Sequence, residues 1–119
     1  MAAPNIVGVT TIYGRTAVQA VGTSATAIVT NSAASGKVLK INTLIVANID
    51  GTSAADITVD LFRSGTAYRL ASTISVPADS SLTPLDKSTV IYLEEGDSLR
   101  LTAGTAGDLE AICSYEEIS

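Results

Sequence analysis

The densest group of residues that could do chemistry is an acidic run formed by Glu94, Glu95 and Asp97. Carboxylates this close together in the chain are candidates for a cation site or an acid–base pair. A calcium ion takes about six to eight oxygen ligands, and this segment alone offers too few at a defined spacing. Gly96 lies inside the run, and glycine adopts the positive φ angles of tight turns. We therefore predict a solvated turn here.

A second oxygen-rich segment contains Asn48 and Asp50, with Asp56 following a few residues later. Counted from Asn48, the twelfth position of a calcium loop would require a glutamate, and Val59 occupies it. Asp50 and Gly51 form a dipeptide that is typical of turns. The segment therefore predicts a turn and no metal site.

Nucleophilic catalysis has little support in this chain. It contains no histidine, so its serines lack the usual general base, and no lysine stands in a recognisable Ser–Lys motif. Its one cysteine, Cys113, has no partner for an intramolecular disulfide and lies on the apolar side of an alternating segment, which predicts a buried structural thiol. Gly8, Gly14 and Gly22 lack the spacing of a phosphate-binding loop. We predict no enzymatic activity, no cofactor and no metal.

The length and charge of the chain limit the number of domains and the classes of partner that we expect. A chain of 119 residues predicts one domain over residues 1–119, with residues 1–5 as a candidate N-terminal arm that could extend to Thr16. Its net charge is −5, and its seven basic residues are scattered singly, which argues against nucleic acid as a partner. No apolar run approaches the ~20 residues that span a membrane, and the first residues do not resemble a secretion signal.

Hydrophobic residues recur with a period of two, which is typical of β-strands with one wet face. Residues 56–61 and 108–115 alternate most regularly, and further strands are expected near 25–30, 37–50, 68–76, 90–93 and 99–101. We expect the last two of these to form a hairpin around residues 94–97. Turn signals separate about eight to ten short strands, which predicts an all-β fold, an antiparallel two-sheet β-sandwich of jelly-roll or immunoglobulin-like type.

Candidate interface residues come from the segment 37–50 and from the tyrosines. Leu39, Ile41 and Ile45 share the parity predicted to face the core, whereas Leu44 and Val46 lie on the opposite parity. The second pair suits either a second core layer or a partner surface. Tyr68 and Tyr115 share parity with apolar neighbours and are predicted to be core residues, whereas the parity of Tyr92 opposes that of its apolar neighbours. We therefore take Tyr92, Leu44 and Val46 as the candidate interface.

Several segments resemble small virion proteins of marine tailed bacteriophages, notably those of cyanobacteria. The segments are Thr26-Ala27-Ile28-Val29-Thr30-Asn31, Lys40-Ile41-Asn42 and most of residues 77–118, including Leu93-Glu94-Glu95-Gly96-Asp97-Ser98-Leu99. The resemblance covers nearly the whole chain and carries no catalytic residues. It implies a virion location, assembly in the host bacterial cytoplasm, and partners that are copies of the chain and phage capsid or tail proteins.

Two roles follow from this resemblance. The first is capsid decoration, in which a homo-oligomer, expected to be a trimer, binds the outer head shell. The second is a tail, neck or fibre-associated module, in which Tyr92 and the Ser- and Thr-rich loops could bind a host glycan. Either role requires only a stable sandwich with an adhesive face, so the residues alone do not choose between them.

Overall fold

The computed structural model describes residues 4–119. These residues form nine β-strands, and none of them lies in a helix with the length and apolar character to cross a membrane. The strands are β1 (Ile12–Ala20), β2 (Thr26–Thr30), β3 (Val38–Asn48), β4 (Ala55–Arg63), β5 (Thr66–Val76), β6 (Ser81–Leu85), β7 (Ile91–Leu93), β8 (Ser98–Ala103) and β9 (Leu109–Ile118).

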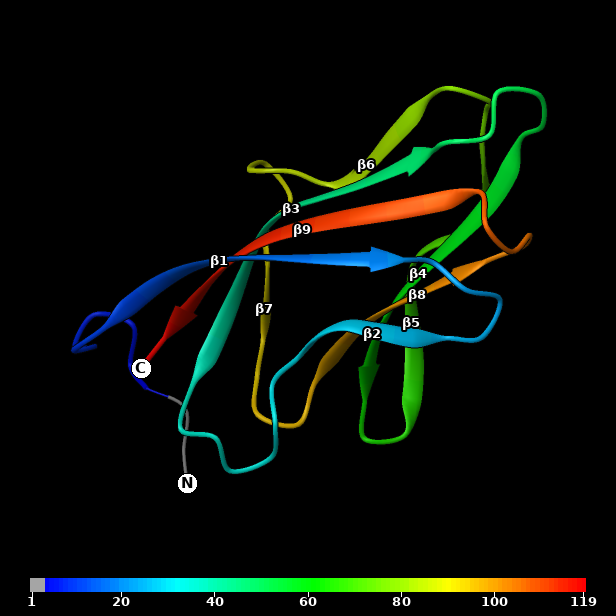
Figure 1. Ribbon diagram of the computed structural model, residues 1–119. Coiled ribbons are helices and arrows are strands. Elements are labelled where there is room, and N and C mark those ends of the chain that lie inside the picture. Colours follow the sequence, from blue (N-terminus) through cyan, green and yellow to red (C-terminus); the bar gives the residue numbers. More distant parts are fainter. Residues whose placement is uncertain (1–3) are drawn as a thin grey trace.

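The strands build two antiparallel sheets that pack face to face (Figure 1). Sheet A has the order β1-β9-β3-β6, and β7 pairs with the same edge of β3 as β6 does. Sheet B has the order β2-β8-β4-β5. The predicted two-sheet β-sandwich is therefore confirmed. The chain crosses repeatedly between the sheets, and the resulting strand order is that of a jelly roll, one of the two predicted types.

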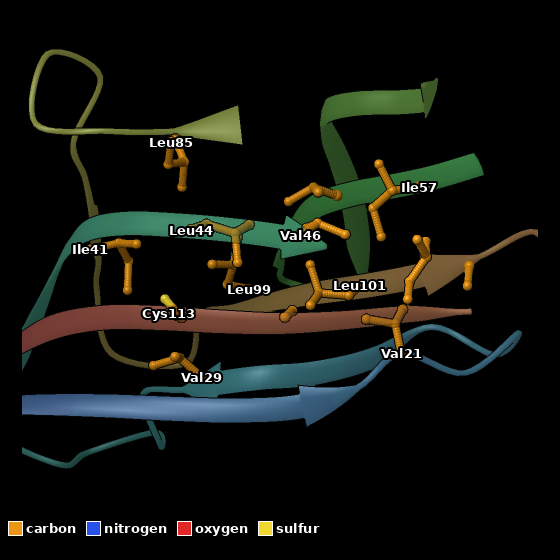
Figure 2. Close-up of a cluster of buried hydrophobic side chains, with 14 of the residues drawn as sticks. Val21, Val29, Ile41, Leu44, Val46, Ile57, Leu85, Leu99, Leu101 and Cys113 are labelled. Carbon is orange, nitrogen blue, oxygen red and sulfur yellow. The ribbon is translucent and has the colours of Figure 1, made fainter. Parts of the chain in front are cut away.

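The core lies between the sheets and follows the predicted alternation in β4 and β9. Ile57 on β4 and Cys113 on β9 point inward (Figure 2), and Val59, Leu109 and Ala111 are buried on the same faces of these strands. Branched side chains on a pleated strand pack well against neighbours on one face, and their burial removes apolar surface from water. The shared core also contains Val21, Val29, Leu39, Ile41, Leu44, Val46, Ala55, Val76, Leu85, Leu93, Leu99, Leu101 and Ala103.

A β-bulge in β3 reverses the parity that the sequence pattern predicts for its second half. The register of β3 on β9 shifts between Ile41 and Thr43. One extra residue turns every following side chain to the other face of the sheet. Leu39 and Ile41 are buried as predicted, but after the bulge Leu44 and Val46 point into the core. Ile45 was predicted to face the core and instead lies on the outer face.

Residues 94–97 do not close the predicted hairpin. β7 pairs with β3 in sheet A, whereas β8 pairs with β2 and β4 in sheet B, so this connection crosses from one sheet to the other. Leu93 and Leu99, on either side of it, are both fully buried in the core between the sheets. Gly96 has a φ of 90°, in agreement with its predicted turn conformation.

Two strands lie where the sequence pattern predicted none. β1 pairs with β9 along its whole length, from Ile12 opposite Ile118 to Ala20 opposite Glu110. An arm that reaches Thr16 is therefore wrong, because this residue lies within β1. Of the candidate arm 1–5, residues 1–3 lie outside the described part of the chain. β6 is the second unpredicted strand, and it lies at the edge of sheet A.

The prediction that Tyr68 belongs to the core is wrong. Tyr68 lies on β5, an edge strand of sheet B, and its side chain is exposed. The pairing of β5 with β4 is interrupted twice by register shifts, and Thr73 adopts a φ of 48°. Tyr68 lies directly opposite Leu61, which packs against the core, so it shares the inner face of the sheet and is exposed because it lies at the edge of that face. The irregularities blunt a sheet edge that would otherwise present a regular row of hydrogen-bonding groups. Tyr115 is half-buried and packs against the core, as predicted.

Candidate functional site

The outer face of sheet A, the side turned away from sheet B, carries an exposed apolar row. Val18 on β1 and Ile45 on β3 both lie opposite Ile112 on the central strand β9. Their exposed fractions are 74%, 37% and 48% respectively, so three branched side chains stand side by side in water. We call these three residues the apolar row. Scattered exposed apolar residues are common, but neighbouring ones on a flat sheet face are typical of an interaction surface.

One end of this face carries an acidic residue between two small side chains. The next row of the sheet contains Ala20, Glu110 and Ala47, with the glutamate between two alanines. A hollow of about 350 Å³ lies over this row and the apolar row. The small alanine side chains leave space around the Glu110 carboxylate, which forms no ion pair within residues 4–119. This end could therefore accept a long cationic side chain.

The other end of the same face is basic. Lys40 lies opposite Glu116 on β9 and opposite Tyr92 on β7. A hollow of about 380 Å³ is lined here by Lys40, Asn42, Lys87, Val90 and Glu116. The Asn42 Nδ2 donates to Glu116 Oε2 at 3.4 Å, while Lys40 and Lys87 form no ion pair with any other residue of the described chain. The two lysines outnumber the one carboxylate.

The three predicted interface residues divide between this face and the core. Tyr92 is exposed on the outer face beside Lys40, where a partner could reach it. Leu44 and Val46 are completely buried, so their assignment to a partner surface is wrong (Figure 2). The bulge in β3 is the reason, because it turns both side chains into the layer between the sheets. They belong to the same core as Leu39 and Ile41, so the second core layer that their parity also suggested does not form.

The apolar row was missed for two reasons. Ile45 was assigned to the core because its parity was counted without the bulge, and Val18 lies in a strand that was not predicted. One signal lies in the sequence: Ile112 shares its parity with Glu110 and Ser114, which places an apolar residue on the polar face of its strand.

The acidic run is not the solvated turn that its composition predicts. Asp97 is only 2% exposed and accepts hydrogen bonds from Arg63 Nε at 2.8 Å, from Arg63 Nη2, and from the Glu94 backbone amide at 2.8 Å. Glu94 pairs with the same guanidinium, and Glu95 accepts a hydrogen bond from the Gly36 amide. The run therefore fastens the connection between the sheets to β4 and to the β2–β3 connection.

Charge and hydrogen bonding hold Asp97 in its ionised form. Burial alone would raise the pKa of this carboxyl group, but the hydrogen bonds from Arg63 and the Glu94 amide, together with the guanidinium charge, lower the pKa below its ordinary value. The hydrogen bond to Asp97 in turn raises the pKa of Arg63, although desolvation opposes the shift. Asp97 is thus a structural group that is charged near neutral pH.

A second buried ion pair lies on the outer face of sheet B. Asp60 on β4 accepts a hydrogen bond from Arg100 Nε on β8 at 2.8 Å. The Arg100 guanidinium also lies over the ring of Phe62, with its carbon 3.9 Å from the ring centroid. Arginine pairs with a carboxylate and stacks on an aromatic ring in this way when it is partly desolvated. The charge of Arg100 is therefore paired with a carboxylate and an aromatic ring of the protein itself.

Two buried asparagines fix the loops at the ends of the sandwich. Asn48 donates from Nδ2 to the carbonyls of Ser53 and Val76, and its Oδ1 accepts from the Asp50 amide. The turn predicted at this position is therefore confirmed. Asn31 donates to the carbonyls of Lys37 and Leu93, and its Oδ1 is hydrogen-bonded to Ser35.

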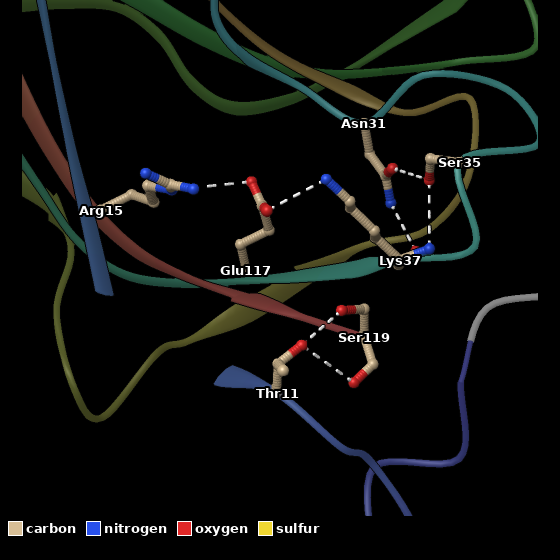
Figure 3. A network of polar contacts seen from close by, with 7 residues as sticks. All are labelled: Thr11, Arg15, Asn31, Ser35, Lys37, Glu117 and Ser119. Atoms are coloured by element: carbon tan, nitrogen blue, oxygen red, sulfur yellow. Dashed lines mark hydrogen bonds and ion pairs between the residues drawn. The ribbon is translucent and has the colours of Figure 1, made fainter. Parts of the chain in front are cut away.

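Polar contacts also tie β1, β9 and β3 together near the chain ends (Figure 3). Glu117 lies between Arg15 at 3.7 Å and Lys37 at 3.0 Å. Thr11 and Ser119 are joined by their hydroxyl groups at 2.7 Å. The cations in this cluster are paired within the chain, which distinguishes them from Lys40 and Lys87.

The other candidates for chemistry were a reactive thiol and a metal-binding cluster, and the described residues provide neither. Cys113 is fully buried, as predicted, and burial raises the pKa of its thiol to about 12. Within residues 4–119, no group of three or more acidic, cysteine or histidine residues could hold a metal ion. The outer face of sheet A is the candidate site, because its apolar and charged side chains are exposed.

Comparisons with known proteins describe the fold but not the family. No protein-family model and no curated protein matches the chain. Among solved structures, the chain is similar to a protein of Bacillus endospore appendages, which are described as disulfide-linked pili. The two structures share a TM-score of 0.54 and 14% sequence identity, over 100% of this chain and 96% of the other. At this identity, the similarity concerns the fold alone.

Proposed function

We propose that this chain is a non-enzymatic structural subunit that acts by adhering to other protein surfaces. The observation that carries the proposal is the outer face of sheet A, where Val18, Ile45 and Ile112 stand exposed on a regular sheet of a protein with a well-filled core. Such a face is costly in water and gains free energy when a partner covers it. A pilus subunit of the same fold is a precedent for a jelly roll that works through assembly.

The charged groups of the interior fit a structural role. The carboxylates of Asp60 and Asp97 are each bound to an arginine, and the thiol of Cys113 is held in its neutral form. Groups held this way stabilise a fold, whereas catalysis needs groups that are accessible and close to their titration point. The single core shared by both sheets suits a subunit that must keep its shape.

Within this class, we propose a virion protein of a tailed bacteriophage that decorates the outer surface of the head shell. The resemblance of residues 26–31, 40–42 and 77–118 to small phage virion proteins supports this narrower assignment. Jelly rolls are also frequent among viral capsid domains. A decoration protein needs one face that holds the shell and another that holds neighbouring copies, and the two outer faces of a sandwich can supply both.

A tail, neck or fibre-associated module is the second candidate. The hollow lined by Lys40, Asn42 and Lys87 lies beside the exposed Tyr92, and amide, ammonium and aromatic groups together are typical of a glycan-binding surface. Binding of a glycan array that is lost in Tyr92→Ala and kept in Tyr13→Ala would favour this role. Tyr13 is the matched control, because it is also an exposed tyrosine on sheet A.

The deciding experiment is quantitative mass spectrometry of washed, purified particles, combined with a density map of the intact particle. Head decoration predicts a copy number comparable with that of the major shell protein, and density over the head. A few copies per particle, confined to the tail, would favour the second candidate. Absence of the chain from purified particles would contradict both roles.

A further inference from the structure

We propose that strand β1 pairs edge to edge with β1 of a second copy, antiparallel and around a two-fold axis, so that the A sheets of the two copies join into one. This inference rests on the proposed structural role and names a partner for that subunit. It starts from the position of β1 at the end of sheet A, where β9 is its one neighbour in the sheet among residues 4–119 (Figure 1).

The outer edge of β1 offers an unbroken row of backbone hydrogen-bonding groups. Thr11 and Ser119 exchange both backbone hydrogen bonds, at 2.9 and 3.0 Å, and the Val21 amide donates to the Leu109 carbonyl at 2.9 Å. The pairing with β9 has no register shift between these points. In an antiparallel pair, every second residue bonds to its neighbour and the residues between them point away. The outward residues are all exposed, and they are Ile12, Gly14, Thr16, Val18 and Ala20.

The other edges of the two sheets, within the part of the chain that the structure describes, are short or irregular. The pairing of β5 is interrupted twice, and β2 has five residues with a register shift against β8. β6 contains Pro84, and β7 has three residues. Bulges, prolines and short strands are the usual means by which proteins prevent edge pairing. β1 has nine residues with no proline and no bulge, so the edge that matches its length and regularity is a second β1.

One register of this pairing uses the whole edge. Hydrogen bonds form only where outward residues lie opposite each other, and the longest such overlap places Thr16 opposite Thr16 of the second copy. Ile12 then lies opposite Ala20, and Gly14 lies opposite Val18, each pair occurring twice because of the two-fold axis. Each hydrogen-bonded pair of residues exchanges two bonds, so about ten backbone hydrogen bonds would join the copies.

The side chains on the outer face fit together in this register. Gly14 has open space beside it, since no atom of residues 4–119 beyond its chain neighbours lies within 4 Å of the position of a Cβ. Val18 of the second copy, 74% exposed in the single chain, lies over this space and diagonally next to Ile12, which is 57% exposed. Pairing therefore covers two branched side chains of each copy that otherwise stand in water.

The inner face of the pair brings a donor to a buried acceptor that has none. Gln19 donates from Nε2 to the carbonyl of Ala27 on β2, a strand of the other sheet, so β2 lies beneath β1 and leaves its edge open. The Oε1 of Gln19 is buried and has no hydrogen-bond partner within the described chain. In the register centred on Thr16, the exposed Tyr13 of the second copy lies opposite Gln19 on this face, and its hydroxyl group can donate to that oxygen.

The charge on β1 favours this register over a shifted one. Arg15 is the one charged side chain of the strand, and the proposed register places it opposite Ala17 of the second copy. Each guanidinium stays beside Glu117 of its own chain, at 3.7 Å, and over its own Tyr13 ring. A two-fold axis at Arg15 would instead set the two guanidinium groups directly opposite each other, which is destabilising.

The joined sheets would form one larger surface, held by a narrow contact. The axis is perpendicular to the sheets, so both outer faces lie on the same side, and the two apolar rows are offset by four residues, about 13 Å along the strands. The contact itself is a strip roughly 30 Å long and ~10 Å deep, about 300 Å² per copy. A stable complex usually buries about 800 Å² per partner, so we expect a weak, reversible dimer that becomes firm where many copies share a surface.

The first test measures self-association of the full chain by analytical ultracentrifugation up to millimolar concentration, where we expect wild-type protein to dimerise reversibly. Thr16→Lys should weaken the dimer about fivefold, because the axis sets two like charges directly opposite each other. Mixing Thr16→Lys with Thr16→Glu should restore it, because the heterodimer pairs opposite charges. Ser72→Lys is the matched control: Ser72 is an exposed hydroxyl residue on β5, an edge strand of the other sheet, and its replacement should leave the dimer unchanged.

Introduced cysteines test the register itself. Opposite residues of a hydrogen-bonded pair have Cα atoms about 5.5 Å apart, within the range that a disulfide spans. Thr16→Cys should therefore form a covalent dimer under mild oxidation. Val18→Cys should form one about tenfold more slowly, because the two copies of this position lie about 13 Å apart, although the position is highly exposed to random collision. A mixture of Gly14→Cys with Val18→Cys should form the heterodimer as readily as Thr16→Cys forms its own dimer, and the buried Cys113 takes no part.

Three results would overturn the inference: a wild-type chain that stays monomeric at millimolar concentration, self-association that responds equally to Ser72→Lys, or a Val18→Cys chain that cross-links as fast as Thr16→Cys. Thermal unfolding verifies the folding of each variant, and recovery in the mixtures would itself show that both chains fold. These outcomes are separate from the proposed function. A monomeric chain that is abundant on heads contradicts only the edge pairing, and an edge-paired dimer that is absent from particles contradicts only the virion role.

Discussion

Asp97→Asn is the substitution that tests most directly how the two sheets are joined. The wild-type carboxylate accepts two hydrogen bonds from Arg63 and one from the Glu94 amide. The asparagine has almost the same shape, but it keeps one acceptor oxygen and turns an amide group toward the guanidinium. A hydrogen bond to a charged group contributes about 1.5–3 kcal/mol, and water can replace part of this at the half-exposed Arg63. We expect a loss of about 2–3 kcal/mol in the free energy of unfolding.

The loss should depend on pH in a defined direction. The pKa of Asp97 is lower in the folded protein than its ordinary value, so its stabilisation is complete above that ordinary value, near pH 4. It is lost as the pH falls through the lower value of the folded state. The difference between wild-type protein and Asp97→Asn should therefore be full at pH 7 and should shrink as the pH falls below about 4.

The assay is thermal unfolding followed by circular dichroism at pH 7 and at about pH 2.5. For a chain of this length, the expected loss lowers the Tm by about 10 °C at pH 7. Glu94→Gln is the matched control, because Glu94 pairs with the same guanidinium but its side chain is 67% exposed, so we expect a loss below about 1 kcal/mol. Equal losses in the two variants, or a Tm difference for Asp97→Asn that stays the same at both pH values, would refute the reasoning.

Three further substitutions or treatments test the interior. Leu44→Ala should lower the free energy of unfolding by about 2–5 kcal/mol in urea titrations, whereas Ile45→Ala should lower it by less than about 1 kcal/mol; the reverse order would contradict the bulge in β3. Asn48→Asp should lower it by about 3 kcal/mol at pH 7, because two donated hydrogen bonds are lost and a buried charge replaces them. Cys113 should not react with a thiol reagent at pH 8 until denaturant is added; rapid modification of the folded protein would show that the thiol is accessible.

The strands and much of the core could be predicted from the sequence because burial of one face leaves a period of two. The period of two correctly predicted the inward side chains of β4 and β9, where alternate residues along the strand are buried. It failed in the second half of β3, because a bulge adds one residue and no distinctive residue type marks it. It also failed in β1, an edge strand that is exposed for most of its length and so has little inward pattern.

The partners of a strand are harder to predict than the strand itself. Residues 94–97 have the length and the glycine of a hairpin turn, and those local features are the same when the connection crosses between sheets. The difference lies in a tertiary contact, Arg63 of β4 reaching Asp97, which is 34 positions away in the chain. The exposed apolar row depends on both effects, since it combines the shifted parity of β3 with the unpredicted strand β1.

The position of β9 has a consequence for how this protein folds. β9 is translated after the other strands, yet it lies at the centre of sheet A, between β1 and β3. Until it inserts, both of its neighbours expose an unpaired edge, and the loop that must close before β1 pairs with β9 contains most of the chain, from Ala20 to Glu110. We therefore expect slow refolding and a partly built intermediate that aggregates at high concentration. Wherever the chain is made in many copies, this last insertion would limit how much folded protein accumulates.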